Sequence, residues 1–374
     1  MQTKRRISPV AARLAAGLTV AACLILTACG SSRNTAPVNN VVNTDIPGAT
    51  VNPSPDRELI ILGAPGRDGY YDAVLDEIVD FHIHYAEQIS RHDDVIVLTG
   101  PQLYDLYVDA LGTDRVANRA VADIWMRDFA PLNSEAPVMM RYSAAGQGGG
   151  RKSQREADYV QAGLARLLRR AGIDVADSEL INDGGNFVDD YHGRVVISRK
   201  FLRDNNLSED QGRSAIGAAT GADHIAFIDA DEQGGLEHAD GVVAFIAPNV
   251  LAINSYPEDP AYAAKLKADL RTGLPNVTLH EIVTPYDGDR IYDARFGSAC
   301  GLYTNMLVTM DRIYVPQFGI PEDAIAIAQL GGWTDKTLIP VSSAQVCRMG
   351  GGVRCMSWQV RGNMAAQLKA WLRQ

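Results

Sequence analysis

The sequence predicts an α/β fold, because segments with strand patterns and segments with helix patterns alternate along most of the chain. Short apolar runs come in groups of two or three, and an amphipathic segment separates one group from the next, about five times. The composition, with 46% apolar and 21% charged residues, is typical of a globular protein. A chain of 374 residues can also bury a substantial core.

The folded part is predicted to begin near Glu58 with a strand, a helix and a second strand. Residues 58–65 (ELIILGAP) are mostly apolar and have the length of a buried strand. Residues 73–91 are predicted to form an amphipathic helix, because Leu75, Ile78, Tyr85 and Ile89 recur at helical spacing. Residues 94–100 (DVIVLTG) form the next predicted strand.

Further helices are predicted over residues 154–171, 208–220, 257–272 and 321–330. Gly172 ends the first of them, and Ser208 starts the second, followed by acids that suit the positive end of the helix dipole. Strand-like runs lie between the helices, at residues 138–142, 194–198, 224–229, 242–247, 251–254 and 306–316. The last run contains Met310-Asp311, which is a plausible hairpin turn. The glycine-rich residues 144–150 are either a plain surface loop or a mobile lid over a site.

Residues 1–28 are predicted to be a secretory signal. Three cations (Lys4, Arg5 and Arg6) precede an apolar run over residues 10–26, which is too short for a stable membrane span. The sequence Leu26-Thr27-Ala28-Cys29 resembles a bacterial lipobox, in which Cys29 would be lipidated; a plain signal cut nearby is the alternative. Residues 29–57 are rich in Ser, Asn, Pro, Thr and Val without periodicity, so we expect a flexible tether. The protein is therefore expected to be anchored by its lipid in the bacterial cell envelope, on the periplasmic or surface side.

The charge of the mature chain is acidic. Removing residues 1–28 removes four cations and no acid, which takes the formal net charge from −10 to −14. An acidic surface argues against a nucleic-acid partner and weakly favours a cationic substrate.

Three cysteines remain after the predicted signal and lipidation site: Cys300, Cys347 and Cys355. In an oxidising envelope, an odd number leaves one thiol free. We predict that Cys355 is free and that Cys300 and Cys347, if any cysteines pair, pair with each other.

The surroundings of Cys355 favour a reactive thiol. Three glycines, Gly350 to Gly352, precede it and allow the backbone to approach a ligand closely. Arg354 is its neighbour, and a guanidinium beside a thiol would favour the thiolate. A tight turn around a buried structural cysteine is the alternative.

Three other segments carry residues suited to chemistry: Trp125-Met126-Arg127-Asp128, Asp183-Gly184-Gly185-Asn186 and His238-Ala239-Asp240-Gly241. Taken alone, an Arg-Asp pair is most often a surface ion pair, Asp-Gly-Gly-Asn is most often a turn, and a lone histidine is more often structural than catalytic. Together with Cys355 they provide a nucleophile, an acid/base and carboxylates. A cysteine and a histidine suit attack on a planar carbon, and two carboxylates suit a substrate in which that carbon belongs to a guanidinium cation.

In this order, the segments resemble the guanidine-modifying superfamily, in particular the agmatine deiminase and Porphyromonas-type peptidylarginine deiminase family. The resemblance runs from about Glu58 to the C-terminus and implies a five-bladed α/β propeller in one deiminase domain, residues 58–374. It identifies Cys355 as the nucleophile, His238 as the acid/base, and Asp128 and Asp240 as the carboxylates that hold the guanidinium. Asn305 matches an asparagine that contacts substrate, and Asp183, Asn186 and Trp125 are also expected to bind substrate.

The resemblance implies hydrolysis of a guanidinium to a ureido product and ammonia through a covalent thiouronium on Cys355. This chemistry needs neither a metal nor an organic cofactor. The acids Asp229, Asp231 and Asp240 have calcium-loop-like spacing with Gln233 and Gly234, but glutamine suits its position poorly. Transfer of the amidino group to another amine, and capture of guanidines without turnover, are the alternatives.

The substrate is expected to be a small guanidine or an arginine-containing peptide. Free or C-terminal arginine presents a carboxylate, for which Arg151 or Lys152 is a candidate partner, whereas agmatine presents an amine and would prefer an acid or an aromatic residue. The chain also departs from the family: Arg354 stands where agmatine deiminases usually carry His, and Asp183 stands where the family commonly has Glu.

Overall fold

The structure is a computed structural model that describes residues 4–5, 57–66, 69–133, 135–233 and 235–374. The predicted signal, the lipidation site Cys29 and nearly all of the predicted tether lie outside these residues. None of the described helices is both long and apolar enough to cross a membrane.

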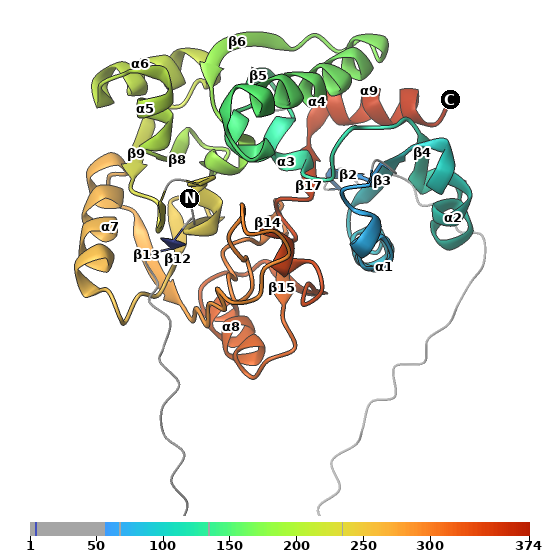
Figure 1. The fold of residues 1–374 in the computed structure, drawn as a ribbon. Helices are drawn as coiled ribbons and strands as arrows, with labels where there is room; N and C mark the ends of the chain where they lie inside the picture. The colour runs from blue at the N-terminus through green and yellow to red at the C-terminus, as the bar shows by residue number, and fades with distance from the viewer. Residues whose placement is uncertain (1–3, 6–56, 67–68, 134, 234) are drawn as a thin grey trace, which may run out of the picture. The chain divides into compact units, whose positions relative to one another are not determined.

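The described strands form small sheets that share one pattern. In the first sheet, β17 (Ser357–Val360) pairs antiparallel with β2 (Leu59–Gly63), and β2 pairs parallel with β3 (Asp94–Thr99) and β3 with β4 (Val116–Asn118). The C-terminal strand therefore lies beside the first strand of the domain (Figure 1). Because Ser357 pairs with Leu62, this sheet fixes the segment that carries Cys355.

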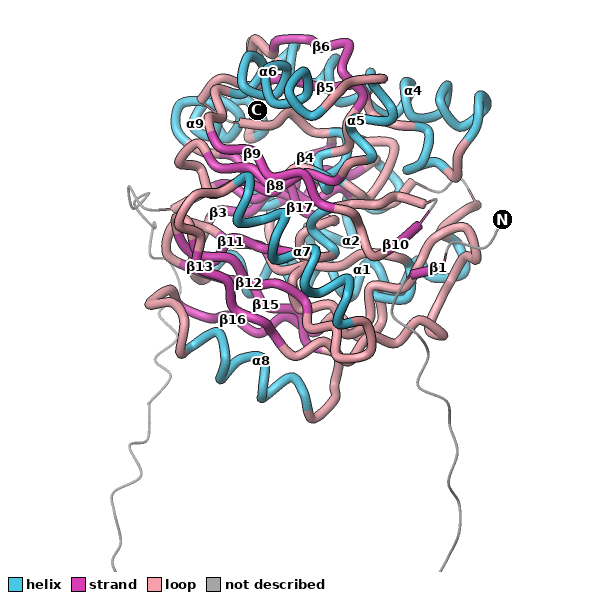
Figure 2. Tube along the Cα trace, turned by 90° about the vertical axis from the view of Figure 1, so that its left-hand side faces the viewer, coloured by secondary structure: helices cyan, strands magenta, loops and turns pink. Residues whose placement is uncertain are grey.

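Three other sheets repeat an antiparallel pair followed by a parallel one. They contain β7 (Val188–Asp189), β8 (Arg194–Ser198) and β9 (His224–Ile228); β11 (Val243–Ala247), β12 (Val250–Asn254) and β13 (Thr278–Ile282); and β14 (Leu307–Val308), β15 (Arg312–Gln317) and β16 (Thr337–Ser342). A parallel pair, β5 (Val138–Arg141) and β6 (Ala176–Ile181), gains its antiparallel neighbour through an isolated bridge between Leu132 and Val138. A short ladder joins β1 (Lys4–Arg5) to β10 (Glu232–Gln233). The strands are thus distributed among the helices and do not form one continuous sheet (Figure 2).

Helices connect the parallel strands of each sheet. The described α-helices are α1 (Leu75–Ser90), α2 (Pro101–Leu111), α3 (Met126–Phe129), α4 (Gly150–Arg170), α5 (Lys200–Asn205), α6 (Glu209–Thr220), α7 (Pro260–Gly273), α8 (Glu322–Gly331) and α9 (Gly362–Leu372). Parallel neighbours need such a crossover, because a tight turn can only join antiparallel strands. The α/β class predicted from the sequence is confirmed.

All of the elements predicted from the sequence are present within a few residues. Ser208 caps α6 as expected, since its Oγ accepts a hydrogen bond from the Gln211 backbone N at 3.3 Å and a capping box is complete. The predicted turn at Met310-Asp311 lies between β14 and β15. The helices α2, α3, α5 and α9, the strands β4, β6, β7, β13, β16 and β17, and the short β1 and β10 were not predicted.

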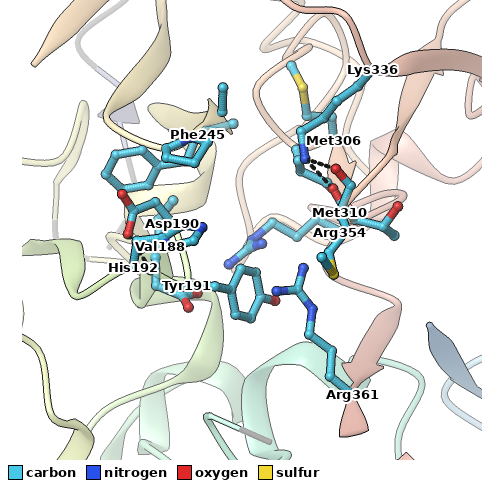
Figure 3. A pocket seen from close by; sticks show the side chains of 16 residues that line it. Val188, Asp190, Tyr191, His192, Phe245, Met306, Met310, Lys336, Arg354 and Arg361 are labelled. Atoms are coloured by element: carbon cyan, nitrogen blue, oxygen red, sulfur yellow. Dashed lines mark hydrogen bonds between the residues drawn. The ribbon is translucent and has the colours of Figure 1, made fainter. Parts of the chain in front are cut away.

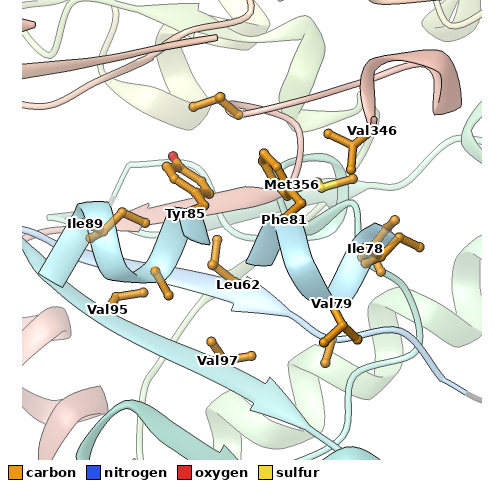
Figure 4. Packing of buried hydrophobic residues seen from close by; sticks show 14 of the residues in the cluster. Leu62, Ile78, Val79, Phe81, Tyr85, Ile89, Val95, Val97, Val346 and Met356 are labelled. Atoms are coloured by element: carbon orange, nitrogen blue, oxygen red, sulfur yellow. The ribbon is translucent and has the colours of Figure 1, made fainter. Parts of the chain in front are cut away.

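Buried side chains of α1 attach the nucleophile segment to the core. Phe81 and Tyr85 are at most 4% exposed and lie on the helix face near Met356, while Leu62 and Val97 pack on the other side of the helix (Figure 4). Burying a side chain of this size contributes about 1.5–3 kcal/mol to the free energy of folding. Met356 therefore anchors the residue that precedes it, Cys355.

A disulfide joins Cys300 to Cys347, and Cys355 is a free, buried cysteine. Both parts of the cysteine prediction are confirmed. The disulfide connects the segment before Asn305 to the 3-10 helix η6 (Cys347–Met349), which leads into the Cys355 loop. A backbone hydrogen bond from Ala299 N to Cys347 O, at 2.9 Å, supports the same connection.

Candidate active site

The loop that delivers Cys355 depends on its glycines. Gly350 ends η6 with a φ of +99°, which L side chains rarely adopt. At Gly351, a Cβ atom would lie 2.5 Å from Cζ3 of Trp125 and 2.8 Å from Cβ of Cys355. Only glycine lets Trp125 and Cys355 approach each other this closely.

The sulfur of Cys355 lies among polar side chains. Asn305 Nδ2 donates a hydrogen bond to Sγ at 3.0 Å, and Sγ lies 3.9 Å from Asp240 Oδ2. Burial and the nearby carboxylates of Asp240 and Asp128 raise the pKa of the thiol well above its usual value, and the hydrogen bond from Asn305 opposes them. Without a cation beside it, Cys355 is therefore held as a thiol.

Arg354 does not have the role predicted from the sequence. Its Nε lies 3.2 Å from Asp240 Oδ2, and its Nη2 donates to the backbone O of Phe187 at 2.9 Å. Its charge is thus directed toward a carboxylate that itself raises the pKa of the Cys355 thiol. The expectation that Arg354 favours the thiolate is wrong, because adjacency in the sequence did not give the direction of the side chain.

His238 is held by two carboxylates. Its Nε2 lies 3.0 Å from Asp183 Oδ2, and its Nδ1 lies 3.7 Å from Asp128 Oδ1. Burial opposes the charged imidazole, but Asp128 and Asp183 outweigh it and raise the pKa of His238 to about 9. At neutral pH the residue is therefore an imidazolium that can give up a proton. Ser143 fixes Asp183 by donating from its backbone N at 2.7 Å and from its Oγ at 2.8 Å.

Asp128 lies on α3 and is 6% exposed. Burial raises the pKa of its carboxyl to about 7; the charge of His238 opposes this, while the neighbouring Asp183 and Asp240 add to it. Its Oδ1 accepts a hydrogen bond from the backbone N of Gly185 at 3.2 Å. A carboxyl with this pKa is readily ionised by a bound cation.

The Asp183-Gly184-Gly185-Asn186 turn packs directly against the other two segments. A Cβ at Gly184 would lie 2.0 Å from the backbone O of Arg127, and one at Gly185 would lie 2.5 Å from Nδ1 of His238. The paired glycines therefore allow three distant parts of the chain to meet. This contact is the physical reason for their place beside Asp183.

Two adjoining cavities lead to the sulfur. The inner one, about 20 Å³, is lined by residues that include Asp128, His238 and Cys355. The outer one, about 380 Å³, shares Trp125, Gly146, Phe296 and Met349 with it. Asp240 and Asn305 lie next to the sulfur without lining either cavity, and both are at most 4% exposed.

The outer cavity contains residues that the sequence did not single out. Aromatic side chains form much of its wall: Tyr70, Tyr71, Tyr159, Tyr292 and Phe296. Its charged residues are Asp123, Glu156 and Arg295. Asp123 accepts hydrogen bonds from Tyr71 Oη at 2.7 Å and from Gln147 Nε2 at 2.9 Å, so the glycine-rich segment 144–150 forms part of this wall. In the sequence, the adjacent tyrosines Tyr70 and Tyr71 were the feature that could have pointed to this cavity.

Two predicted substrate-binding residues lie elsewhere. Asn186 donates to Asn182 Oδ1 at 3.0 Å and accepts from the backbone N of Ser198 at 2.8 Å, so both ends of its amide support the local turn. Arg151 is exposed on the first turn of α4 and lines neither of the two cavities. Because Arg151 is exposed to solvent on this turn, its side chain does not contribute to the site.

Within the described residues, no group of three or more His, Cys, Asp or Glu side chains is arranged to hold a metal ion. In the segment with calcium-like spacing, Asp229 instead pairs with Arg199 at 3.4 Å and with Lys265 at 3.1 Å.

Residues 54–360 match the family described as Porphyromonas-type peptidyl-arginine deiminase. A candidate agmatine deiminase of Lactococcus lactis is 25% identical over 313 residues, which cover 73% of this chain and 84% of that protein. The solved structure of the Campylobacter jejuni ("C. Jejuni") agmatine deiminase is 19% identical, with a TM-score of 0.67 over 82% of this chain and 93% of that one. An agmatine deiminase of Enterococcus faecalis has a TM-score of 0.65 and 19% identity, over 81% of this chain and 93% of that one. At these identities the structural matches support the fold.

Proposed function

Because the chain belongs to the Porphyromonas-type peptidyl-arginine deiminase family, we propose that it hydrolyses a guanidinium group to a ureido group and ammonia. The substrate is agmatine, arginine or peptidyl-arginine. The observation that carries this proposal is the position of Cys355, whose Sγ lies at the inner cavity with His238 and Asp128 and 3.9 Å from Asp240.

Asp128 and Asp240 provide the grip for the substrate. Their side chains come from separate segments and flank the sulfur, so a guanidinium between them would place its central carbon near Sγ. A planar cation with several N–H donors suits two carboxylates better than a single ammonium does. Both acids are buried, which strengthens their interaction with a bound charge.

The substrate cation also activates the nucleophile in this proposal. Burial, Asp240 and Asp128 keep the pKa of Cys355 high. A guanidinium that binds between these carboxylates offsets their charge and brings its own positive charge to the sulfur, so the pKa of the thiol falls. The thiolate therefore forms when substrate is bound.

The reaction proceeds in two halves. The thiolate forms a C–S bond to the guanidinium carbon, His238 protonates one amino group, and the C–N bond breaks to release ammonia. A water molecule deprotonated by His238 then attacks the thiouronium carbon, and the C–S bond breaks to return the Cys355 thiolate and a ureido product. Asn305, whose Nδ2 lies 3.0 Å from Sγ, is placed to donate a hydrogen bond to the thiolate.

The test is ammonia release from agmatine, free arginine and peptides with internal or C-terminal arginine, by wild type and Cys355→Ser. We expect the wild type to release ammonia and the variant to release none while still binding substrate. Ammonia release by Cys355→Ser would exclude this nucleophile. A wild type that binds guanidines without releasing ammonia would indicate a binding protein instead.

Transfer of the amidino group to an amine would use the same first half-reaction. Product analysis with and without an amine acceptor separates the two. A ureido product that is unaffected by the acceptor supports hydrolysis, and an amidinated acceptor contradicts it.

We also propose a five-bladed propeller architecture. The support is that four sheets repeat an antiparallel pair followed by a parallel pair, and that the fifth reaches the same order through the Leu132 to Val138 bridge. Each repeat also has a helix between its parallel strands, as expected for ββαβ units.

The envelope location is a further proposal, supported by the sequence Leu26-Thr27-Ala28-Cys29 after an apolar run. Expression of the full-length chain in bacteria fed labelled fatty acid tests it. Label should enter the wild type and not Cys29→Ala, and the wild type should sediment with membranes. Equal labelling of both proteins would contradict lipidation at Cys29.

A further inference from the structure

A third cavity lies next to the active site but does not belong to it. It has a volume of about 170 Å³ and is lined by Arg354, whose neighbour Cys355 lines the inner catalytic cavity instead. In the described part of the chain, this cavity shares no lining residue with the inner or outer cavity. The mechanism above makes no use of it.

Cationic side chains converge on this cavity. Arg354 and Arg361 point toward the same space beside the ring of Tyr191 (Figure 3). The guanidinium carbon of Arg361 lies 3.4 Å from the centre of that ring. Lys336 also lines the cavity and donates from Nζ to the backbone O of Met310 at 2.6 Å.

The two arginines keep donors that the described residues do not satisfy. Arg361 donates a hydrogen bond from Nε to Glu58 Oε2 at 2.8 Å. Its two terminal nitrogens have no hydrogen-bond partner in the described chain. Arg354 is 8% exposed; its Nε pairs with Asp240 and its Nη2 donates to the backbone O of Phe187, which leaves Nη1 without a hydrogen-bond partner among the described residues. Buried donors without partners are costly, so a ligand that accepts from them would be bound favourably.

A third arginine, Arg127, does not line the cavity, but its charge interacts with that of Arg354. Its Nε and Nη2 are buried and have no hydrogen-bond partner within the described residues. Burial and the neighbouring charge of Arg354 lower its pKa, while the charges of Asp240 and Asp189 oppose them. An anion in the cavity would relieve this repulsion.

The acids nearby leave these donors available. Both oxygens of Asp190 accept backbone N–H groups, from His192 at 2.8 Å and from Asn249 at 3.1 Å. Asp189 lines the cavity, and no described residue donates a hydrogen bond to its carboxylate. Burial raises the pKa of Asp189, against the opposing charges of Arg354, Arg361 and Arg127.

Most of the remaining wall is apolar, although His192 and Thr309 also line it. Val188, Phe245, Pro248, Met306 and Val308 line it; Phe245 lies on β11, and Met306 directly precedes β14 (Figure 3). A ligand that fills the cavity must therefore combine an anionic group with a short apolar body.

We propose that this cavity binds a small carboxylic acid with a short aliphatic body. Its carboxylate accepts from Arg354 and Arg361, and its aliphatic part packs against Phe245 and Met306. A guanidinium offers two parallel N–H donors that match a carboxylate, which favours this group over a single-point acceptor.

The ligand would act on the active site through Arg354. This residue also faces Asp240, and a bound carboxylate would share its positive charge. Asp240 would then hold a guanidinium substrate more strongly, so the KM for that substrate should fall. By linkage, substrate should tighten carboxylate binding by the same factor.

Calorimetric titration of the full-length protein with butyrate tests the site, with butylammonium as the probe of opposite charge and ionic strength held constant. We expect saturable 1:1 binding of butyrate and no binding of butylammonium. Arg361→Gln should weaken butyrate binding about tenfold or more, since hydrogen bonds to charged groups contribute about 1.5–3 kcal/mol. Lys152→Met is the matched control, because the Lys152 side chain is 84% exposed and lies on α4.

Arg361→Gln also removes the partner of Glu58, so Lys336→Met provides a second variant with an independent effect on the fold. Absence of butyrate binding by wild type, or equal binding by wild type and both folded variants, would overturn the proposal. Binding without a fall in KM would overturn the coupling through Arg354. Calorimetry does not depend on turnover, so failure of the proposed deiminase activity would leave the binding result interpretable.

Discussion

Replacing Gly351 by alanine is expected to disable the nucleophile, because the added methyl group has no room. Its Cβ would lie 2.5 Å from Cζ3 of Trp125, 2.8 Å from Cβ of Cys355 and 3.2 Å from Sγ of Cys355. Real Cβ atoms do not approach heavy atoms this closely, and the obstacles are a partly buried indole that packs against the core and the nucleophile itself. The Cys355 side chain, Trp125 or the loop between them must shift.

The expected size of the effect follows from overpacking and misplacement. Overpacking a filled site typically costs about 1–3 kcal/mol of unfolding free energy, which a domain of this size survives. A displacement of the reacting sulfur by about 1 Å can lower the rate about 100-fold. We therefore expect Gly351→Ala to stay folded and to lose about two orders of magnitude in kcat/KM for ammonia release.

Gly352→Ala is the matched control, because it is the same change one residue later. A Cβ at Gly352 would meet only Asn305 Oδ1, at 3.6 Å, which is ordinary van der Waals contact. The assay compares kcat/KM by ammonia release with the midpoint of urea unfolding for both variants. Equal activity of the two variants, or full activity of Gly351→Ala, would refute the packing argument.

Other predictions concern charge and covalent structure. In the free enzyme, kcat/KM should rise with pH through about 7, as Asp128 ionises, and fall through about 9, as His238 loses its proton. Asp183→Asn removes a carboxylate that raises the pKa of His238, so the fall in kcat/KM at high pH should occur at lower pH in this variant. If that fall occurred at the same pH as in the wild type, the titration of His238 would not be its cause. Replacing both Cys300 and Cys347 by alanine should lower the free energy of unfolding by about 4 kcal/mol, from the loop closed across a sequence separation of 47. An unchanged urea midpoint would contradict this.

The elements that could be predicted are those whose pattern reflects burial. The strands β2 and β12 are apolar along nearly all of their length, and both were expected. The strands β6 and β13 were missed because at least half of their residues are polar and nearly all are at least partly exposed, so they lack the alternation or apolar run that marks a strand. Their backbone pairing, rather than their side chains, places them in the sheets.

The site could be predicted only as far as residue types in short segments reveal chemistry. Resemblance to a family identified Asn305, and the structure places its Nδ2 3.0 Å from a sulfur 50 residues later in the chain. The directions of Arg354 and Arg151 were beyond the sequence, because each depends on how a turn or a helix start is set on the rest of the fold. Arg295 and most of the aromatic wall of the outer cavity come from segments without a recognisable pattern, and Tyr159, although it lies on the predicted helix α4, has no feature in the sequence that marks it as a cavity residue.

The Cys300–Cys347 disulfide also bears on how active protein can be obtained. Cys300, Cys347 and Cys355 allow three pairings, and two of these consume the nucleophile. Thiol–disulfide exchange among them during refolding would give a mixture of active molecules and inactive disulfide isomers, all of identical mass. Specific activity should therefore follow the fraction of molecules whose one free thiol is Cys355, as mapped by alkylation, and production in an oxidising compartment with an isomerase should raise that fraction.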